Sequence, residues 1–153
     1  MALKDTIQND MKAALLSGDS GNRFVGDTLR NLKAAILDEE VKQNKRETGL
    51  SDEEIEKIIA REVKKRKESL AVYEQNGRPE LAEAERKEAD VLSRYLPEQL
   101  SEGKLRDIVS AKIADLGVSG PQAMGQVIGA VKQEVGNSAD GATLAKIVKE
   151  TLG

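Results

Sequence analysis

Lysines, arginines, carboxylates and glycines are the residues of this 153-residue sequence whose types and spacing could do chemistry. The sequence contains no cysteine and no histidine. It therefore offers no thiolate nucleophile, no sulfur-ligated metal and no imidazole, which is the commonest general base. We predict no catalytic residue, no metal site and no bound cofactor, so binding is the chemistry left to the charged side chains.

The strongest basic run is Arg61–Lys67, which a helix would spread around its circumference. Lys64, Lys65 and Lys67 are expected to face water, whereas Arg66 falls beside the apolar stripe and needs a carboxylate partner. Such a run could contact the phosphates of a nucleic acid, but the whole chain has a net charge of -3. A solvated helix face is the simpler interpretation of these lysines, and phosphate binding is the alternative.

Three acidic runs, at residues 38–40, 52–54 and 83–88, carry the carboxylates that many metal ions prefer. Di-iron helical bundles combine glutamates with a Glu-x-x-His motif, which a sequence without histidine cannot provide. We therefore predict that all three runs are solvated helix faces rather than metal sites.

Glycine recurs near the turns of the last third of the sequence, but without the spacing of a dinucleotide fingerprint or a P-loop. Gly125 and Gly129 lie four residues apart inside a predicted helix, where glycine costs about 1 kcal/mol relative to alanine. Such a pair lets another backbone approach closely. Tight packing inside the protein is the preferred interpretation, and contact with a ligand is the alternative.

The elements that position these residues are predicted to be helices. Aromatic residues form 2% of the chain and charged residues 33%, which favours packing between amphipathic helices over a β-sandwich. A turn over Ser17–Asn22 separates the first two helices, and a capping box at Ser51 and Glu54 opens the third. The apolar spacing places the first four helices at about residues 3–15, 25–41, 51–77 and 79–96.

Pro97 ends the fourth helix, because proline restricts the residue before it and fits poorly inside a helix. Three shorter helical patterns follow, around residues 105–113, 124–131 and 144–152. Gly117 ends the first of them, and Asp140 caps the last. The predicted fold is all-α, with a four-helix domain over residues 1–97 and a three-helix domain over residues 98–153.

Five strings of the sequence resemble one known family. They are Leu29–Ile36, Arg61–Ser69, Gly77–Ala82, Tyr95–Leu100, and Met124-Gly125 followed by Gly136 and Asp140-Gly141. On these strings the chain resembles the YqeY proteins, also called GatB/YqeY domain-containing proteins, along nearly its whole length. The resemblance implies a C-terminal domain similar to the transfer-RNA-gripping tail of GatB, a subunit of the glutamine-dependent transfer-RNA amidotransferase.

The C-terminal region departs from this family pattern at positions where relatives carry basic residues. Gln126 follows Met-Gly and Ala142 follows Asp-Gly, and Gly136-Asn137-Ser138 stands where a Gly-Arg or Gly-Lys is common. Residues 101–153 hold six cations, which are Lys104, Arg106, Lys112, Lys132, Lys146 and Lys149. They also hold six anions, which are Glu102, Asp107, Asp115, Glu134, Asp140 and Glu150. The region is therefore neutral, and it can hold RNA phosphates only where its lysines converge on one face.

The resemblance implies candidate RNA contacts in both halves of the chain. In the C-terminal half they are Lys132, Lys146 and Lys149. In the N-terminal half they are Lys64, Lys65 and Lys67.

Three functions follow from these expectations. The first is a non-catalytic, translation-associated accessory protein that binds transfer RNA. The second is a helical interaction module that binds a protein of the translation or amidotransferase apparatus in a groove between the two domains. The third is the carbon-nitrogen ligase activity, with glutamine as amido donor, that is associated with the family, although no residue set here fits a kinase-like cradle or an amidase triad.

We expect a cytoplasmic protein with no membrane partner. The first residues lack the apolar core of a signal peptide, and no stretch approaches the roughly 20 apolar residues that span a bilayer.

Overall fold

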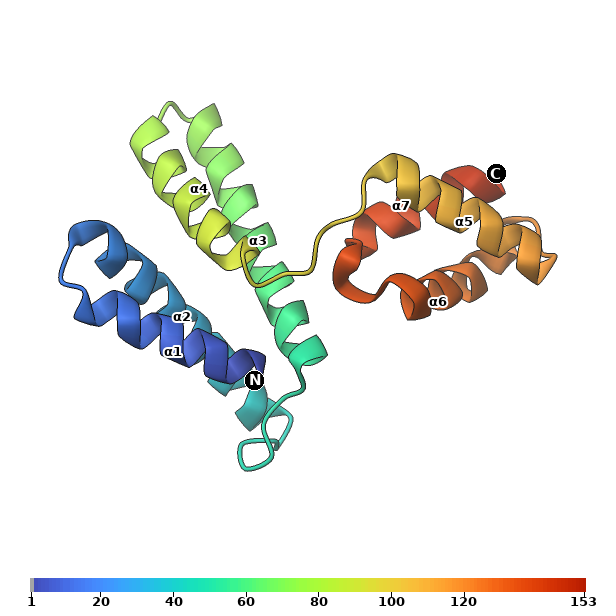
Figure 1. Ribbon diagram of the computed structural model, residues 1–153. Helices are drawn as coiled ribbons and strands as arrows, with labels where there is room; N and C mark the ends of the chain where they lie inside the picture. Colours follow the sequence, from blue (N-terminus) through green and yellow to red (C-terminus); the bar gives the residue numbers. More distant parts are fainter. Residues whose placement is uncertain (1) are drawn as a thin grey trace. The chain divides into compact units, whose positions relative to one another are not determined.

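The computed structural model describes residues 2–153, which form seven α-helices (Figure 1). No strand occurs within these residues, so the predicted all-α class is confirmed. The helices are α1 Leu3–Leu16, α2 Ser20–Lys42, α3 Asp52–Gln75, α4 Pro79–Ser93, α5 Glu102–Leu116, α6 Met124–Val135 and α7 Gly141–Leu152. Short 3₁₀ turns at Pro121–Ala123 and Gly136–Ser138 precede and follow α6.

The contacts between residues divide the chain into two compact units, one that ends at Leu96 and one that begins at Pro97. We call them the N-terminal unit and the C-terminal unit. That they are independent domains with the predicted boundary at Pro97 stays a prediction. No helix within residues 2–153 combines the length and the apolar character that a bilayer span requires.

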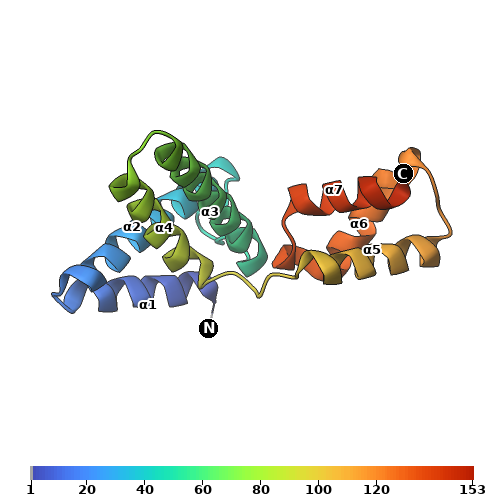
Figure 2. The same ribbon diagram turned by 90° about the horizontal axis from the view of Figure 1, so that it is seen from above.

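The N-terminal unit consists of two helical hairpins, α1 with α2 and α3 with α4. The two helices of each hairpin lie side by side in both views (Figures 1 and 2). Each helix contributes an apolar stripe to one shared core. The most deeply buried members of this core are Ile7, Leu29, Ile36, Ile55, Ile59 and Leu92. These buried residues recur at the apolar helical spacing from which the four helices are predicted.

Residue pairs along the α1–α2 hairpin hold it in register. Lys4 forms a 2.5 Å ion pair with Glu40, and the Lys33 ammonium donates to the side-chain oxygen of Gln8. Glu40 has only 1% of its surface exposed. The prediction that residues 38–40 form a solvated face is therefore wrong for Glu40, because its position on α2 turns it toward α1.

Helix α2 begins at Ser20, five residues before the predicted start at Val25. The Asp19 carboxylate caps it by accepting a hydrogen bond from the Asn22 backbone N–H at 2.8 Å. The predicted turn over Ser17–Asn22 is therefore too long, because its second half forms the first turn of the helix. The capping box predicted at the start of α3 is confirmed.

Helix α4 ends at Ser93, three residues before the predicted end at Leu96. The backbone N–H groups of Arg94, Tyr95 and Leu96 each bond to the carbonyl three residues earlier, as in a 3₁₀ turn. This tightening fits the approach of Pro97, which disfavours a helical conformation in the residue before it.

The C-terminal unit is formed by α5, α6 and α7, each of which contacts the other two. Its core consists of the buried residues Leu105, Val109, Ala123, Val127, Val131, Leu144, Ile147 and Val148. Gly117 ends α5 in the left-handed region at φ 63°, and the Asp140 side chain caps α7, as predicted. The backbone N–H of Leu100 donates to the Ser138 carbonyl at 2.8 Å, which fixes the entry to α5.

Candidate nucleic-acid interface

The predicted RNA contacts of the C-terminal unit lie on its two last helices. Lys132 is in the last turn of α6, and Lys146 and Lys149 are on α7. All three are exposed. Because Lys146 and Lys149 are three residues apart, their side chains share one face of α7, opposite the core.

Lys132 reaches across to α7. Its ammonium nitrogen lies 3.9 Å from the point where a Cβ on Gly141 would sit, so it stands over the first turn of that helix. Gly141 and Lys149 are eight residues apart, which is roughly 12 Å along a helix axis. The structure therefore gathers the three lysines around α7, with Lys146 and Lys149 on its exposed side and Lys132 over its first turn.

The three lysines are also unpaired. Within residues 2–153, neither Lys132 nor Lys146 nor Lys149 has a carboxylate within 4.0 Å. The ion pairs of the C-terminal unit, Arg106 with Glu150 at 2.8 Å and Lys112 with Glu134 at 3.5 Å, use other cations. The unit has no net excess of cations, but these three ammonium groups remain available to an external anion.

The two glycines of α6 lie on its exposed face. A Cβ at Gly125 or Gly129 would meet no atom within 4 Å in the described chain, so the predicted tight packing inside the protein is wrong. Gly125, Gly129 and Lys132 are separated by four and three residues, which aligns them along one side of α6. Gln126, which is also exposed, adds no charge beside them. The result is a strip of nearly bare backbone that leads to the Lys132 side chain.

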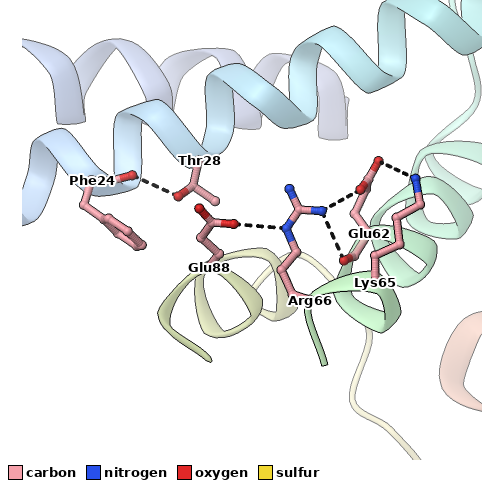
Figure 3. A network of polar contacts seen from close by, with 6 residues as sticks. All are labelled: Phe24, Thr28, Glu62, Lys65, Arg66 and Glu88. Carbon is pink, nitrogen blue, oxygen red and sulfur yellow. Dashed lines mark hydrogen bonds and ion pairs between the residues drawn. The ribbon is translucent and has the colours of Figure 1, made fainter. Parts of the chain in front are cut away.

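The second predicted patch lies on α3, where Lys64, Lys65 and Lys67 are exposed as predicted. Arg66, in contrast, has a side chain only 20% exposed and is held by Glu62 at 2.7 Å and Glu88 at 3.2 Å (Figure 3). The prediction that Arg66 needs a carboxylate partner is confirmed. This network joins α3 to α4, so Arg66 is a structural residue.

Comparison with known proteins identifies the family. The family described as Yqey-like protein matches residues 4–152. The chain belongs to the YqeY family.

One relative of this YqeY chain is the protein named "Altered inheritance of mitochondria protein 41, mitochondrial" from Clavispora lusitaniae. It is 29% identical over 96 residues, a segment that is 62% of this chain and 52% of the relative. The YqeY chain therefore spans about half the length of that relative, whose name describes the relative alone.

The acidic runs of this YqeY protein stabilise its helices. Within the described residues, no three carboxylates come together in a way that could hold a metal ion. Glu83 pairs with Arg86 at 2.7 Å, and Glu88 pairs with Arg66. Burial, followed by the nearby Glu88 carboxylate, raises the pKa of Glu85. The nearby Arg66 guanidinium acts in the opposite direction and lowers the pKa of Glu85.

Sequence reasoning missed one polar contact of the YqeY fold. The Tyr95 hydroxyl donates to the Asp10 carboxylate at 2.6 Å and so ties the turn after α4 to α1. Burial, followed by the hydrogen bond to Asp10, raises the pKa of Tyr95 above its ordinary value of 10.0. Both residues line a groove of about 710 Å³ with Leu3 and Arg94. No local signal could have revealed a contact between residues 85 positions apart.

Proposed function

We propose that this YqeY protein is a non-catalytic accessory protein that binds transfer RNA through its C-terminal unit. The observation that carries the proposal is the group of three exposed, unpaired lysines around α7, with Lys146 and Lys149 on this helix and Lys132 over its first turn. Beside it, the bare face of α6 at Gly125 and Gly129 gives a nucleic-acid backbone room to approach. The choice of transfer RNA among RNAs comes from the resemblance to the tail of GatB.

The arrangement supports contact with phosphates rather than recognition of bases. Lysines are point charges that neutralise phosphates without reading sequence. The sequence has one phenylalanine and two tyrosines, and all three lie before residue 96, so the C-terminal unit has no aromatic platform on which bases could stack. Three phosphate contacts correspond to a slope of about -2 to -3 for log K against log salt concentration. Binding should therefore be weak and strongly dependent on salt.

The proposal assigns no bond-making step to the chain. An amidotransferase needs groups that act as nucleophile, base and oxyanion donor in one site. The described residues bring together lysine, glutamate and arginine side chains in ion pairs, without such a constellation. Any carbon-nitrogen ligase activity connected with this protein would thus belong to partner proteins that act on the RNA it holds.

Fluorescence anisotropy with a labelled transfer-RNA pool tests the proposal. The variant Lys132→Gln/Lys146→Gln/Lys149→Gln should bind at least about tenfold more weakly than wild type, with a shallower salt slope. A matched control, Lys12→Gln/Lys42→Gln/Lys104→Gln, removes three exposed lysines from other surfaces. Equal binding by wild type and the first variant, with equal salt slopes, would reject the C-terminal lysines as the RNA contacts.

An interaction module for a partner protein is the second candidate function. It is favoured by Leu37 and Val41, which are one turn apart on α2 and are 43% and 59% exposed. Large apolar side chains at such spacing suit the apolar face of a partner helix. The variant Leu37→Glu/Val41→Glu should then fail to recover a protein that wild type recovers from extract, with transfer-RNA binding unchanged. Equal recovery of that protein by both would reject this surface.

A further inference from the structure

The outer face of α3 carries more cations than the predicted patch. Besides Lys64, Lys65 and Lys67, the exposed residues of this face include Lys57 and Arg61. The opposite side of the helix is buried in the core through residues such as Ile59. We call these five exposed cations the α3 cationic face.

The α3 cationic face is compact. At about 100° per residue, Lys57, Arg61 and Lys64 fall within an arc of about 60° around the helix axis, and Lys65 and Lys67 flank them on either side. From Lys57 to Lys67 the helix rises roughly 15 Å. Arg66, whose guanidinium is held between Glu62 and Glu88, is withdrawn from this face (Figure 3).

Four of these five cations have no ion-pair partner in the described part of the chain. Within residues 2–153, Lys57, Arg61, Lys64 and Lys67 form no ion pair, whereas Lys65 pairs with Glu62 at 3.9 Å. Several of them stand three or four residues apart, a spacing at which like charges repel and destabilise a helix.

Arg86 of helix α4 shows the opposite arrangement. It bridges Glu83 at 2.7 Å and Glu74 at 2.9 Å, so its charge is matched within the protein. A protein with a net charge of -3 has enough carboxylates to match the α3 cations in the same way, yet leaves them exposed and close together. Such a surface gains stability when an external polyanion neutralises it.

We propose that the α3 cationic face binds a stretch of nucleic-acid phosphate backbone, with Lys57, Arg61 and Lys64 as its central contacts. This inference deepens the proposed function, on which it rests for the choice of RNA as ligand, by naming a second surface and two residues, Lys57 and Arg61. Phosphate backbone is the occupant because the five cations outnumber the two exposed carboxylates on the same side of α3, Glu53 and Glu68. Stable protein interfaces instead have an apolar, aromatic-rich centre, and the only large exposed apolar side chain on α3 among the described residues is Val72, beyond the cations.

The test uses the full chain and a fluorescein-labelled transfer-RNA pool at about 50 mM and about 200 mM salt. In the variant Lys57→Gln/Arg61→Gln/Lys64→Gln we expect the affinity to fall by at least about tenfold, and the slope of log K against log salt to become shallower by about two to three. The control Lys12→Gln/Arg46→Gln/Lys87→Gln removes two lysines and one arginine that are exposed elsewhere in the N-terminal unit. Its affinity should change by less than about threefold.

A second variant guards against misfolding and separates charge from shape. Lys57→Arg/Arg61→Lys/Lys64→Arg keeps all three charges and should bind like wild type, while far-UV circular dichroism should show the same helix content in every variant. A change below about twofold in the Gln variant, or an equal loss in the control, would overturn the proposal. Loss of binding in the charge-conserving variant would also overturn it, because phosphate neutralisation requires only the charges.

Two comparisons keep this inference distinct from the proposed function. If the α3 variant binds like wild type while the C-terminal lysine variant does not, the α3 proposal fails and the proposed function stands. The reverse result supports the α3 cationic face and rejects the C-terminal lysines. Unlabelled polyglutamate that binds the α3 face as tightly as transfer RNA, with the same loss in the Gln variant, would overturn the assignment to nucleic acid in favour of an acidic protein.

Discussion

One substitution, Gly129→Ala, is expected to have opposite effects on the stability of the fold and on the proposed binding of RNA. Gly129 lies inside α6, is exposed, and has open space where a Cβ would sit. Alanine is more favourable than glycine in a helix interior by about 0.8–1.0 kcal/mol. Gly129→Ala should therefore raise the free energy of unfolding by about 0.5–1 kcal/mol, and it should weaken binding of transfer RNA because the added methyl group keeps the backbone of the RNA away.

Urea denaturation followed by circular dichroism measures the first effect, and anisotropy with the labelled transfer-RNA pool measures the second. A gain of 1 kcal/mol corresponds to about 2–4 °C in Tm for a chain of about this length that unfolds in one step. Gly129→Gln carries a longer side chain into the same open space and should weaken binding further, by about threefold or more, since close van der Waals contacts are lost.

Gly26 provides the matched control. A Cβ at this glycine of α2 would lie 2.5 Å from Leu15 Cδ2 and 2.7 Å from Leu15 Cγ. Gly26→Ala should therefore lower the free energy of unfolding by about 1–3 kcal/mol through overpacking, despite the better helix propensity of alanine. If Gly129→Ala destabilised the protein, the open space at Gly129 would be refuted. If it stabilised the protein without any change in RNA binding, the bare face of α6 would lie outside the interface.

Three further predictions concern the N-terminal unit, and urea denaturation measures each of them. Lys4→Met should lower the free energy of unfolding by about 1–3 kcal/mol, because Glu40, with a side chain 2% exposed, would lose its ion-pair partner; an unchanged value would contradict this. Ser51→Ala should cost about 1 kcal/mol through loss of the N-cap of α3, and a cost below a few tenths would show that the capping box contributes little. Burial and the hydrogen bond to Asp10 raise the pKa of Tyr95 above 10.0, so the folded protein favours the neutral hydroxyl. The contribution of this hydroxyl to the free energy of unfolding is complete below about pH 10 and is lost as the pH rises further. The stability advantage of wild type over Tyr95→Phe should therefore stay constant up to about pH 9 and shrink as the pH rises above about 10, and an advantage that grew with pH would contradict the assigned direction.

The sequence contained enough information to predict the helices, because their cores follow a 3.6-residue apolar period and their ends have local caps. Ser51, Gly117 and Asp140 end or begin helices through groups only a few residues away. The start of α2 was predicted too late because glycine and polar residues after Asp19 resemble a loop. Only the N-cap formed by Asp19 distinguishes the start of a helix from a loop here, and its hydrogen bond reaches Asn22, three residues away.

The burial of single polar and small residues could be predicted less well than the helices. Glu40 looks like its acidic neighbours in the sequence, and only the pairing of α2 with α1 places it inside. The close helix approach expected at Gly125 and Gly129 occurs instead at Gly26. The exposure of Gly125 and Gly129 could have been predicted, because Val127 and Val131 mark the buried side of α6 and the two glycines lie on the other side.

Which charges are available for binding is also a property of the folded chain. A basic run such as Arg61–Lys67 does not show which members have partners, and partnership decides which can meet a phosphate. The structure separates Arg66, bound by carboxylates from two helices, from exposed neighbours on the same helix. The contact of Lys132 with the first turn of α7 likewise depends on how α6 and α7 pack together.

The most direct test of the proposed function is the salt dependence of transfer-RNA binding by wild type and by Lys132→Gln/Lys146→Gln/Lys149→Gln. We predict that wild type binds with an affinity that falls steeply as salt rises, and that the variant binds at least about tenfold more weakly with a slope shallower by about two to three. Binding by wild type that did not depend on salt, or a variant indistinguishable from wild type, would contradict the account.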